Sequence, residues 1–203
     1  MRILVIGATG TIGRAVVDEL AARHDIVTVS RNTRPASVDI VDSDSIRAMY
    51  QAVGPVDAVI STTGQARFAP LAQLGDDDFA FSMNNKLMGQ VNLVRIGLDH
   101  VRDNGVIVLT SGVLARTPMA GSAAISLVNA GLEGFARAAA LEVPRGIRVN
   151  VVSPPWVSET LKSLGMDPSH GLPAKTVART YAEAVEGKHN GAVLEPPAET
   201  VVG

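Results

Sequence analysis

The stretch Ile3-Leu4-Val5-Ile6-Gly7-Ala8-Thr9-Gly10-Thr11-Ile12-Gly13 decides the fold of this 203-residue chain. Four apolar residues, followed by a turn with glycine at every third position, predict a buried strand that leads into a helix. In such a turn Gly7 lets the chain bend, Gly10 lets the backbone approach a pyrophosphate, and Gly13 lets helix and strand pack closely. Free N–H groups at the helix start would hold the anion. The alternative is a tight strand-to-helix turn that binds no ligand.

Outward from this turn, short apolar runs alternate with longer helical patterns. The runs are apolar at consecutive positions, which is typical of parallel strands covered on both faces. The pattern predicts an α/β fold, a three-layer doubly wound parallel sheet (Rossmann fold) of about seven strands. Glycine and proline are spread as turn residues, so we expect one domain over residues 1–203, with a short substrate lid near 158–173 and a surface-lying segment from Pro196. Apolar runs lie at 25–30, 57–62, 105–111, 147–153 and 191–196, and helical patterns at 11–23, 43–53, 76–101, 122–143 and 174–186.

Composition excludes several classes of protein. Hydrophobic residues make up 46% of the chain and charged residues 19%, against about 25% charged in typical domains, so we expect a tightly packed protein. The net charge of -2 without a basic block argues against a nucleic-acid partner. The absence of cysteine excludes disulfides and thiolate catalysis and suits the cytoplasm. Asp76–Asp78 fits helix capping better than a metal site, and no apolar run is long enough to span a membrane.

The end of the second predicted strand carries Ser30-Arg31-Asn32. A dinucleotide fold that selects NAD usually places an acidic residue there, and none is present. Arg31 offers a cationic fork suited to the 2′-phosphate of NADP, with Ser30 and Asn32 as further hydrogen-bond donors. We therefore expect NADP(H) as cofactor. The alternative is a solvated surface arginine.

Several further motifs occur in the order found in short-chain dehydrogenases/reductases, and the chain resembles that family over most of its length. The resemblance implies a Rossmann-fold oxidoreductase that acts on a small molecule. The matching segments are Gly7–Gly13, Asp39-Ile40, Ser61-Thr62-Thr63-Gly64, Thr110-Ser111, Gly131–Phe135, Ile147–Asn150 and Ser153–Val157.

The resemblance also implies which residues bind the cofactor. It assigns the pyrophosphate to the glycine-rich turn, the adenine to Asp39 and Ile40, the ribose to the turn after the third strand, and the carboxamide to the proline-rich segment. Trp156 would lie near the nicotinamide, although it is equally suited to anchoring the core. The predicted cofactor-binding residues are Gly7, Thr9, Gly10, Thr11, Ile12, Gly13, Ser30, Arg31, Asn32, Asp39, Ile40, Thr62, Thr63, Gly64, Pro154, Trp156 and Val157.

The catalytic Tyr-x-x-x-Lys signature of the family is missing. The segment Leu132–Phe135 places the expected tyrosine at Ile125 and the expected lysine at Asn129. The two tyrosines of the chain, Tyr50 and Tyr181, lie in other helical patterns, and none of its four lysines restores the pair. In the family this tyrosine exchanges a proton with the substrate oxygen. Loss of such an acid/base residue typically costs about 10²- to 10⁴-fold in rate.

Two residues are candidates to replace the pair. Gly89 places Lys86 where the family carries an asparagine that faces the site, and there an ammonium group could stabilise an oxyanion or donate a proton. The alternative is a lysine that binds carbonyl or ribose oxygens without chemistry. Ser111 is expected to donate a hydrogen bond to a substrate oxygen, although the serine of the family could align with Gly112 instead.

The sequence thus predicts an NADP(H)-dependent oxidoreductase that moves hydride to or from a small carbonyl/alcohol or an activated C=C bond, with catalytic Ser111 and Lys86. The competing hypothesis is an NADP(H)-binding sensor or scaffold without redox turnover. A lyase or isomerase has no positive signal. The Ala- and Gly-rich helix at 122–141, with the family resemblance, implies a homo-oligomer, a dimer or tetramer; packing within one chain would use the same small residues.

Overall fold

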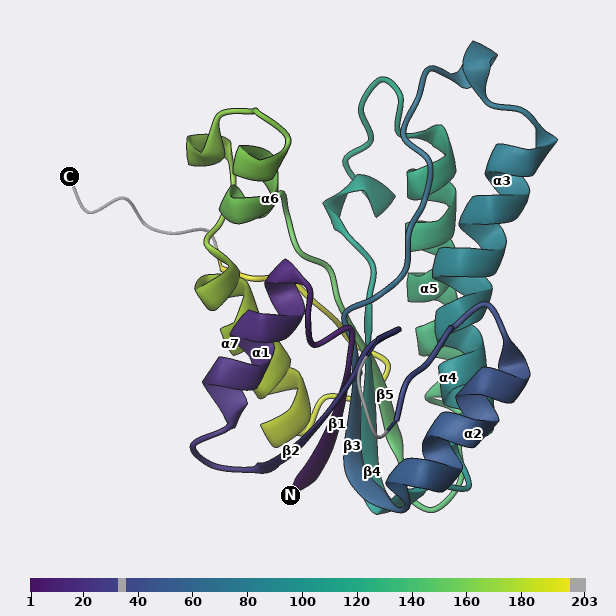
Figure 1. The fold of residues 1–203 in the computed structure, drawn as a ribbon, viewed down its shortest axis with the longest axis vertical. Helices are drawn as coiled ribbons and strands as arrows, with labels where there is room; N and C mark the ends of the chain where they lie inside the picture. Colours follow the sequence, from purple (N-terminus) through teal and green to yellow (C-terminus); the bar gives the residue numbers. More distant parts are fainter. Residues whose placement is uncertain (33–35, 198–203) are drawn as a thin grey trace.

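The structure is a computed structural model that describes residues 1–32 and 36–197, and its centre is a parallel sheet between two layers of helices (Figure 1). Residues 198–203, most of the segment expected to lie on the surface, fall outside the described residues. The strands are β1 (Arg2–Ile6), β2 (Asp25–Val29), β3 (Val56–Ser61), β4 (Val101–Thr110), β5 (Arg148–Val152) and β6 (Val193–Leu194). The helices are α1 (Thr11–Leu20), α2 (Ser43–Val53), α3 (Asp76–Ser82), α4 (Gly89–Gly97), α5 (Ala123–Ala139), α6 (Ser158–Ser163) and α7 (Ala174–Glu186).

The doubly wound parallel sheet is confirmed, but among the described residues it has six strands rather than about seven. Their order is β2-β1-β3-β4-β5-β6, with every pair parallel. The connection from β2 to α2, residues 30–42, forms one isolated bridge in its described part, between Ser30 and Ser37. It contains no helix and no further strand in its described part, so β2 is the edge of the sheet.

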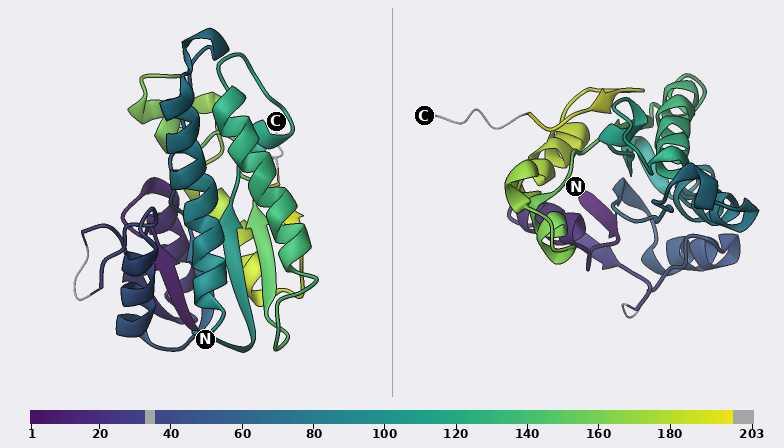
Figure 2. Two further views of the ribbon diagram at one scale, coloured as in Figure 1. Left: turned by 90° about the vertical axis from the view of Figure 1, so that its right-hand side faces the viewer. Right: turned by 90° about the horizontal axis from the view of Figure 1, so that it is seen from above.

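Two separate apolar cores hold the layers together. On one face α2, α4 and α5 cover the sheet through side chains such as Ile46, Leu93 and Leu132. On the other face α1 and α7 lie side by side and bury Val16 and Tyr181 against the strands. The views from the side and from above show these helices on opposite faces of the sheet (Figure 2). Burial on both faces explains the consecutive apolar residues of the strands.

The chain reverses its winding direction between β1 and β3. From β1 it crosses to β2 on one side, then returns to place β3 on the other side. Ligands of doubly wound sheets bind outside the carboxyl ends of the strands at such a point. Thr62, which follows β3, joins the carboxyl ends of β1 and β3 at this point. Both its backbone N–H and its hydroxyl donate to the Ile6 carbonyl, at 2.9 and 3.0 Å.

The long helix expected at 76–101 is interrupted. Residues Met83–Met88 form a π-helical segment between α3 and α4. Such wide turns are rare and often occur at functional sites. The predicted lid contains α6 and a 3₁₀ turn at Pro168–His170; its action as a lid stays a prediction.

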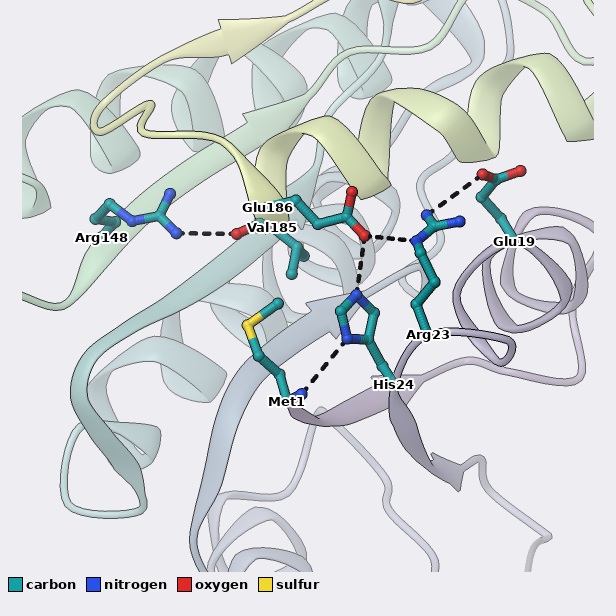
Figure 3. Close-up of polar contacts among 7 residues, drawn as sticks. All are labelled: Met1, Glu19, Arg23, His24, Arg148, Val185 and Glu186. Atoms are coloured by element: carbon teal, nitrogen blue, oxygen red, sulfur yellow. Dashed lines mark hydrogen bonds and ion pairs between the residues drawn. The ribbon is translucent and has the colours of Figure 1, made fainter.

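A polar cluster joins the C-terminal ends of α1 and α7, at the opposite end of the sheet from the switch point (Figure 3). Arg23 Nε and His24 Nε2 lie 3.0 and 2.9 Å from the same carboxylate oxygen of Glu186. Arg148 donates to the Val185 carbonyl at 3.0 Å. The cluster fastens the two helices to each other and to the sheet. No helix of the described residues is long and apolar enough to cross a membrane.

Candidate functional site

A cleft runs along the carboxyl ends of β1, β3 and β4, in two halves that share residues 62–64. One half is a cavity of about 350 Å³ beside the glycine-rich turn and the end of β2. The other, of about 270 Å³, lies between the π-helical segment, α5 and the loop after β5. An elongated ligand with two chemically different ends fits this arrangement.

The glycine-rich turn has the geometry that its sequence predicts. Gly7 has a φ of +87°, and a Cβ there would lie 2.9 Å from Thr62 Oγ1. A Cβ on Gly13 would lie only 2.1 Å from the Gly7 carbonyl oxygen, so α1 packs on the turn only with glycine at this position. Thr9 and Gly10 line the cleft, whereas Gly13 supports the turn from below. Thr11, the first residue of α1, lies outside both halves of the cleft.

The first half of the cleft brings together the residues predicted to bind the adenosine end. Ser30, Arg31, Asn32 and Ile40 all line it. Asp39 does not; its carboxylate lies 3.6 Å from Arg31 NH2 in an exposed ion pair. An exposed pair of this kind contributes little to stability and leaves the guanidinium free to exchange partners. Residues 33–35, which follow this loop, lie outside the described part of the chain.

The second half of the cleft collects the remaining predicted residues. Ile125 and Asn129, at the positions of the missing signature, also face it. Tyr50 and Tyr181 are fully buried elsewhere, and burial raises the pKa of both phenols. Neither tyrosine can replace the missing one. The predicted residues that line this half are Ile12, Thr62, Thr63, Gly64, Lys86, Ser111, Pro154, Trp156 and Val157.

Lys86 is the most unusual group in the cleft. It lies in the π-helical segment and only 8% of its surface is exposed. Its ammonium group has no hydrogen-bond or ion-pair partner among the residues that the structure describes. Burial lowers the pKa of Lys86 from 10.5 to about 8. A buried cation without a partner is costly, which points to a function rather than to stability.

Gln90, which the sequence did not suggest, holds Lys86 in place. Its side-chain amide donates to the Thr110 carbonyl and accepts from the Thr110 N–H, both at 2.9 Å. The same amide nitrogen lies 3.4 Å from the Lys86 carbonyl oxygen. Gln90 therefore fixes the π-helical segment against the end of β4, where Ser111 follows.

A second missed residue, Glu133, contacts Ser111 directly. The Ser111 hydroxyl donates to Glu133 Oε1 at 3.1 Å, and Arg116 Nε donates to the other carboxylate oxygen at 3.2 Å. The spacing of residues in the sequence could have indicated that Glu133 lies near the cleft. Ile125, Asn129 and Glu133 are spaced by four residues, so they follow one stripe of α5 that faces the cleft.

Asn129 takes the position of the lysine of the signature and leaves an acceptor unused. Its Nδ2 lies 3.5 Å from the Gly112 carbonyl oxygen, and its buried Oδ1 has no hydrogen-bond partner among the described residues. A Cβ on Gly112 would lie 3.1 Å from Asn129 Nδ2. The glycine and the asparagine therefore fit each other, and Ser111 is the serine that faces the cleft.

These features fit a dinucleotide cofactor. A turn that tolerates no extra Cβ, free N–H groups at the start of α1, a cationic fork at Arg31 and the unused oxygen of Asn129 lie along one cleft. No cluster of groups that could hold a metal ion occurs in residues 1–32 and 36–197.

Comparison with known proteins identifies the family. A sequence profile described as "Enoyl-(Acyl carrier protein) reductase" matches residues 5–186. The chain is 29% identical over 210 residues to the 3-oxoacyl-[acyl-carrier-protein] reductase FabG of Salmonella typhimurium, covering 90% of this chain and 84% of the relative. This protein therefore belongs to the short-chain dehydrogenase/reductase family of oxidoreductases, as the sequence motifs predicted.

Solved structures agree with this assignment. The protein lin1944 from Listeria innocua is 38% identical and matches with a TM-score of 0.91, over 96% of this chain and 98% of that chain. A short-chain dehydrogenase from Burkholderia cenocepacia J2315, solved in complex with NADP, is 25% identical and matches with a TM-score of 0.81 over 96% and 95% of the two chains.

Proposed function

We propose that this protein transfers hydride between NADP(H) and a small carbonyl/alcohol or activated C=C substrate. The observation that carries the proposal is the largely buried side chain of Lys86, which lines the same cleft as the glycine-rich turn. An ammonium group at this place in the cleft can stabilise the negative charge that develops on a substrate oxygen during hydride transfer, which supports turnover.

The cofactor would lie along the whole cleft. The glycine-rich turn and the N–H groups at the start of α1 would bind the pyrophosphate, and Arg31 with Ser30 and Asn32 the 2′-phosphate. Residues 62–64 would contact the ribose, and Pro154, Trp156 and Val157 would border the nicotinamide. The complex of the Burkholderia relative with NADP supports the choice of cofactor. Bound NADPH supplies the hydride.

Lys86 would act on the substrate oxygen. Its ammonium group stabilises the negative charge that develops there, in a cleft where burial lowers the pKa of Lys86 to about 8. Gln90 keeps the segment that carries Lys86 against β4. We also propose that the protein acts in the cytoplasm as a homo-oligomer, a dimer or tetramer, without a metal ion, a nucleic-acid partner or a membrane.

A second candidate function is an NADP(H) sensor or scaffold without turnover. The observation that favours it is the pair Ile125 and Asn129, which line the cleft where the family places its acid/base residues. Such a protein would distinguish NADPH from NADP⁺ by affinity and would transfer no hydride.

Isotope transfer separates the two candidates. NADPH that carries deuterium at C4 of the nicotinamide is incubated with the protein and a panel of small aldehydes, ketones and enones, and the products are analysed by mass spectrometry. We expect deuterium in at least one product and loss of the transfer in Lys86→Met. Tight NADPH binding without transfer to any member of the panel would favour the sensor.

A further inference from the structure

We propose that Ser111 accepts a hydrogen bond from a hydroxyl group of the substrate, and that Glu133 is the positioning residue that sets this polarity. The inference rests on the proposed function and deepens it, because it identifies the preferred ligand of the cleft as an alcohol. It replaces the expectation that Ser111 donates to a substrate oxygen.

The direction of the Ser111 hydrogen bond follows from its partner. Ser111 and Glu133 are each only 4% exposed, and their side-chain oxygens lie 3.1 Å apart. A carboxylate can only accept, whereas a serine hydroxyl has one hydrogen to donate and two lone pairs. The hydrogen of Ser111 therefore points to Glu133, and only lone pairs remain for a ligand in the cleft.

Arg116 keeps the carboxylate in this role. Its Nε donates to Glu133 Oε2 at 3.2 Å, and its terminal nitrogen pairs with Glu195 beyond β6. Arg137, one turn further along α5, lies 4.0 Å from the same Oε2. Both cationic partners lie on one oxygen of this buried carboxylate, so its other oxygen stays available to Ser111.

The other polar groups of the cleft determine which ligand oxygen can satisfy all the hydrogen-bond donors and acceptors. Lys86 can only donate, whereas Ser111 and the unused Oδ1 of Asn129 can accept. An alcohol oxygen accepts from Lys86 and donates its own hydrogen to Ser111. A carbonyl oxygen accepts from Lys86 but has no hydrogen to donate to the lone pairs of Ser111, which is unfavourable in a buried site.

The same contacts provide a route for the proton when an alcohol is oxidised. The C–H bond of the carbinol carbon breaks and its hydrogen leaves as hydride for C4 of the oxidised nicotinamide of NADP⁺. The O–H proton moves to Ser111 Oγ while Ser111 passes its own hydrogen to Glu133, and the C=O bond forms. Reduction of the carbonyl runs through the same atoms in reverse.

Binding of a matched pair of probes tests the polarity without turnover. The probes are 4-fluorobenzyl alcohol with NADPH and 4-fluorobenzaldehyde with NADP⁺, because neither combination can react, and their dissociation constants come from ¹⁹F NMR titration. In Glu133→Gln the amide oxygen faces Arg116 and the amide nitrogen donates to Ser111, which frees the Ser111 hydrogen for the cleft. We expect the ratio of alcohol to aldehyde affinity to fall about tenfold in this variant.

Two further variants complete the test. Ser111→Ala should weaken binding of the alcohol about five- to tenfold and leave the aldehyde unchanged. Glu142→Gln, an exposed glutamate just beyond α5, should leave the ratio at the wild-type value. If Glu133→Gln does not fold, as judged by thermal unfolding, Ser111→Ala decides.

The proposal is overturned if a folded Glu133→Gln keeps the wild-type ratio, or if Ser111→Ala weakens the aldehyde rather than the alcohol. Failure of the wild-type complex to bind the alcohol at millimolar concentration also overturns it. NADPH binding is measured first in the same samples. Its absence in the wild type would refute the proposed function itself, and so the two failures are distinguishable.

Discussion

Replacement of Lys86 by methionine should stabilise the protein at neutral pH while it abolishes hydride transfer. Burial lowers the pKa of Lys86 from 10.5 to about 8 in the folded chain. This difference corresponds to roughly 3 kcal/mol of unfavourable free energy for the charged folded state, as an upper value. Methionine keeps a long unbranched side chain in the same space without a charge.

The pH dependence follows from the direction of the shift. Between pH 8 and 10.5 the unfolded chain binds more protons at this lysine than the folded chain, so wild-type stability rises with pH there. Below pH 8 the full penalty applies. The advantage of Lys86→Met should therefore be greatest at pH 7 and shrink to about half or less by about pH 9.5.

Urea unfolding of the cofactor-free protein at the two pH values measures this advantage. Lys188→Met, which removes an exposed lysine beyond α7, is the matched control and should show no such pH-dependent gain. A Lys86→Met variant that is less stable than wild type at pH 7, or whose stability difference is the same at both pH values, would refute the reasoning.

Three further predictions concern the cofactor, the turn and the polar cluster. Arg31→Ala should weaken NADPH binding about 10- to 100-fold, by loss of charge-assisted hydrogen bonds, and leave NADH binding nearly unchanged in fluorescence titrations; equal effects on both cofactors would contradict it. Gly13→Ala should unfold or lose NADPH binding, because its Cβ would lie 2.1 Å from the Gly7 carbonyl oxygen. The matched variant Gly134→Ala, with open space around its Cβ, should gain about 0.5–1 kcal/mol in free energy of unfolding, as measured by urea unfolding. The hydrogen bond from His24 is the largest factor that lowers the pKa of Glu186 below 4.5 in the folded protein. The ionised Glu186 therefore stabilises the fold above pH 4.5, and this stabilisation is lost as the pH falls through the folded pKa. Glu186→Gln should therefore lose less than about 1 kcal/mol in urea unfolding at pH 6, and this loss should shrink as the pH falls below 4.5. A loss that does not change with pH would argue against the ion pair.

The sequence predicted the features that depend on local pattern. The apolar runs and the glycine-rich turn were sufficient for the fold, since a parallel sheet needs strands apolar on both faces and the turn admits no Cβ at Gly13. The place of Lys86 in the cleft was inferred from its position three residues before Gly89 in the sequence. The count of strands was too high, because the described part of the connection between β2 and α2 forms one isolated bridge and no strand.

The features that were missed depend on contacts between distant segments. The hydrogen bond of Ser111 to Glu133 joins residues 22 positions apart, and that of Gln90 to Thr110 joins residues 20 apart. No local pattern shows the partner of either side chain, so the polarity of Ser111 could not be derived from sequence. The π-helical turn around Lys86 likewise packs against α5, which is distant in sequence, and helix propensity does not indicate it.

The central claim is that the cleft binds NADP(H), and a titration tests it most directly. NADPH and, separately, NADH are added to the purified protein while nicotinamide fluorescence and energy transfer from Trp156, the single tryptophan, are recorded. The account predicts saturable binding of NADPH, a clear preference over NADH, and transfer from Trp156 at the border of the cleft. Binding of neither cofactor would contradict it and reduce the glycine-rich turn to a structural element.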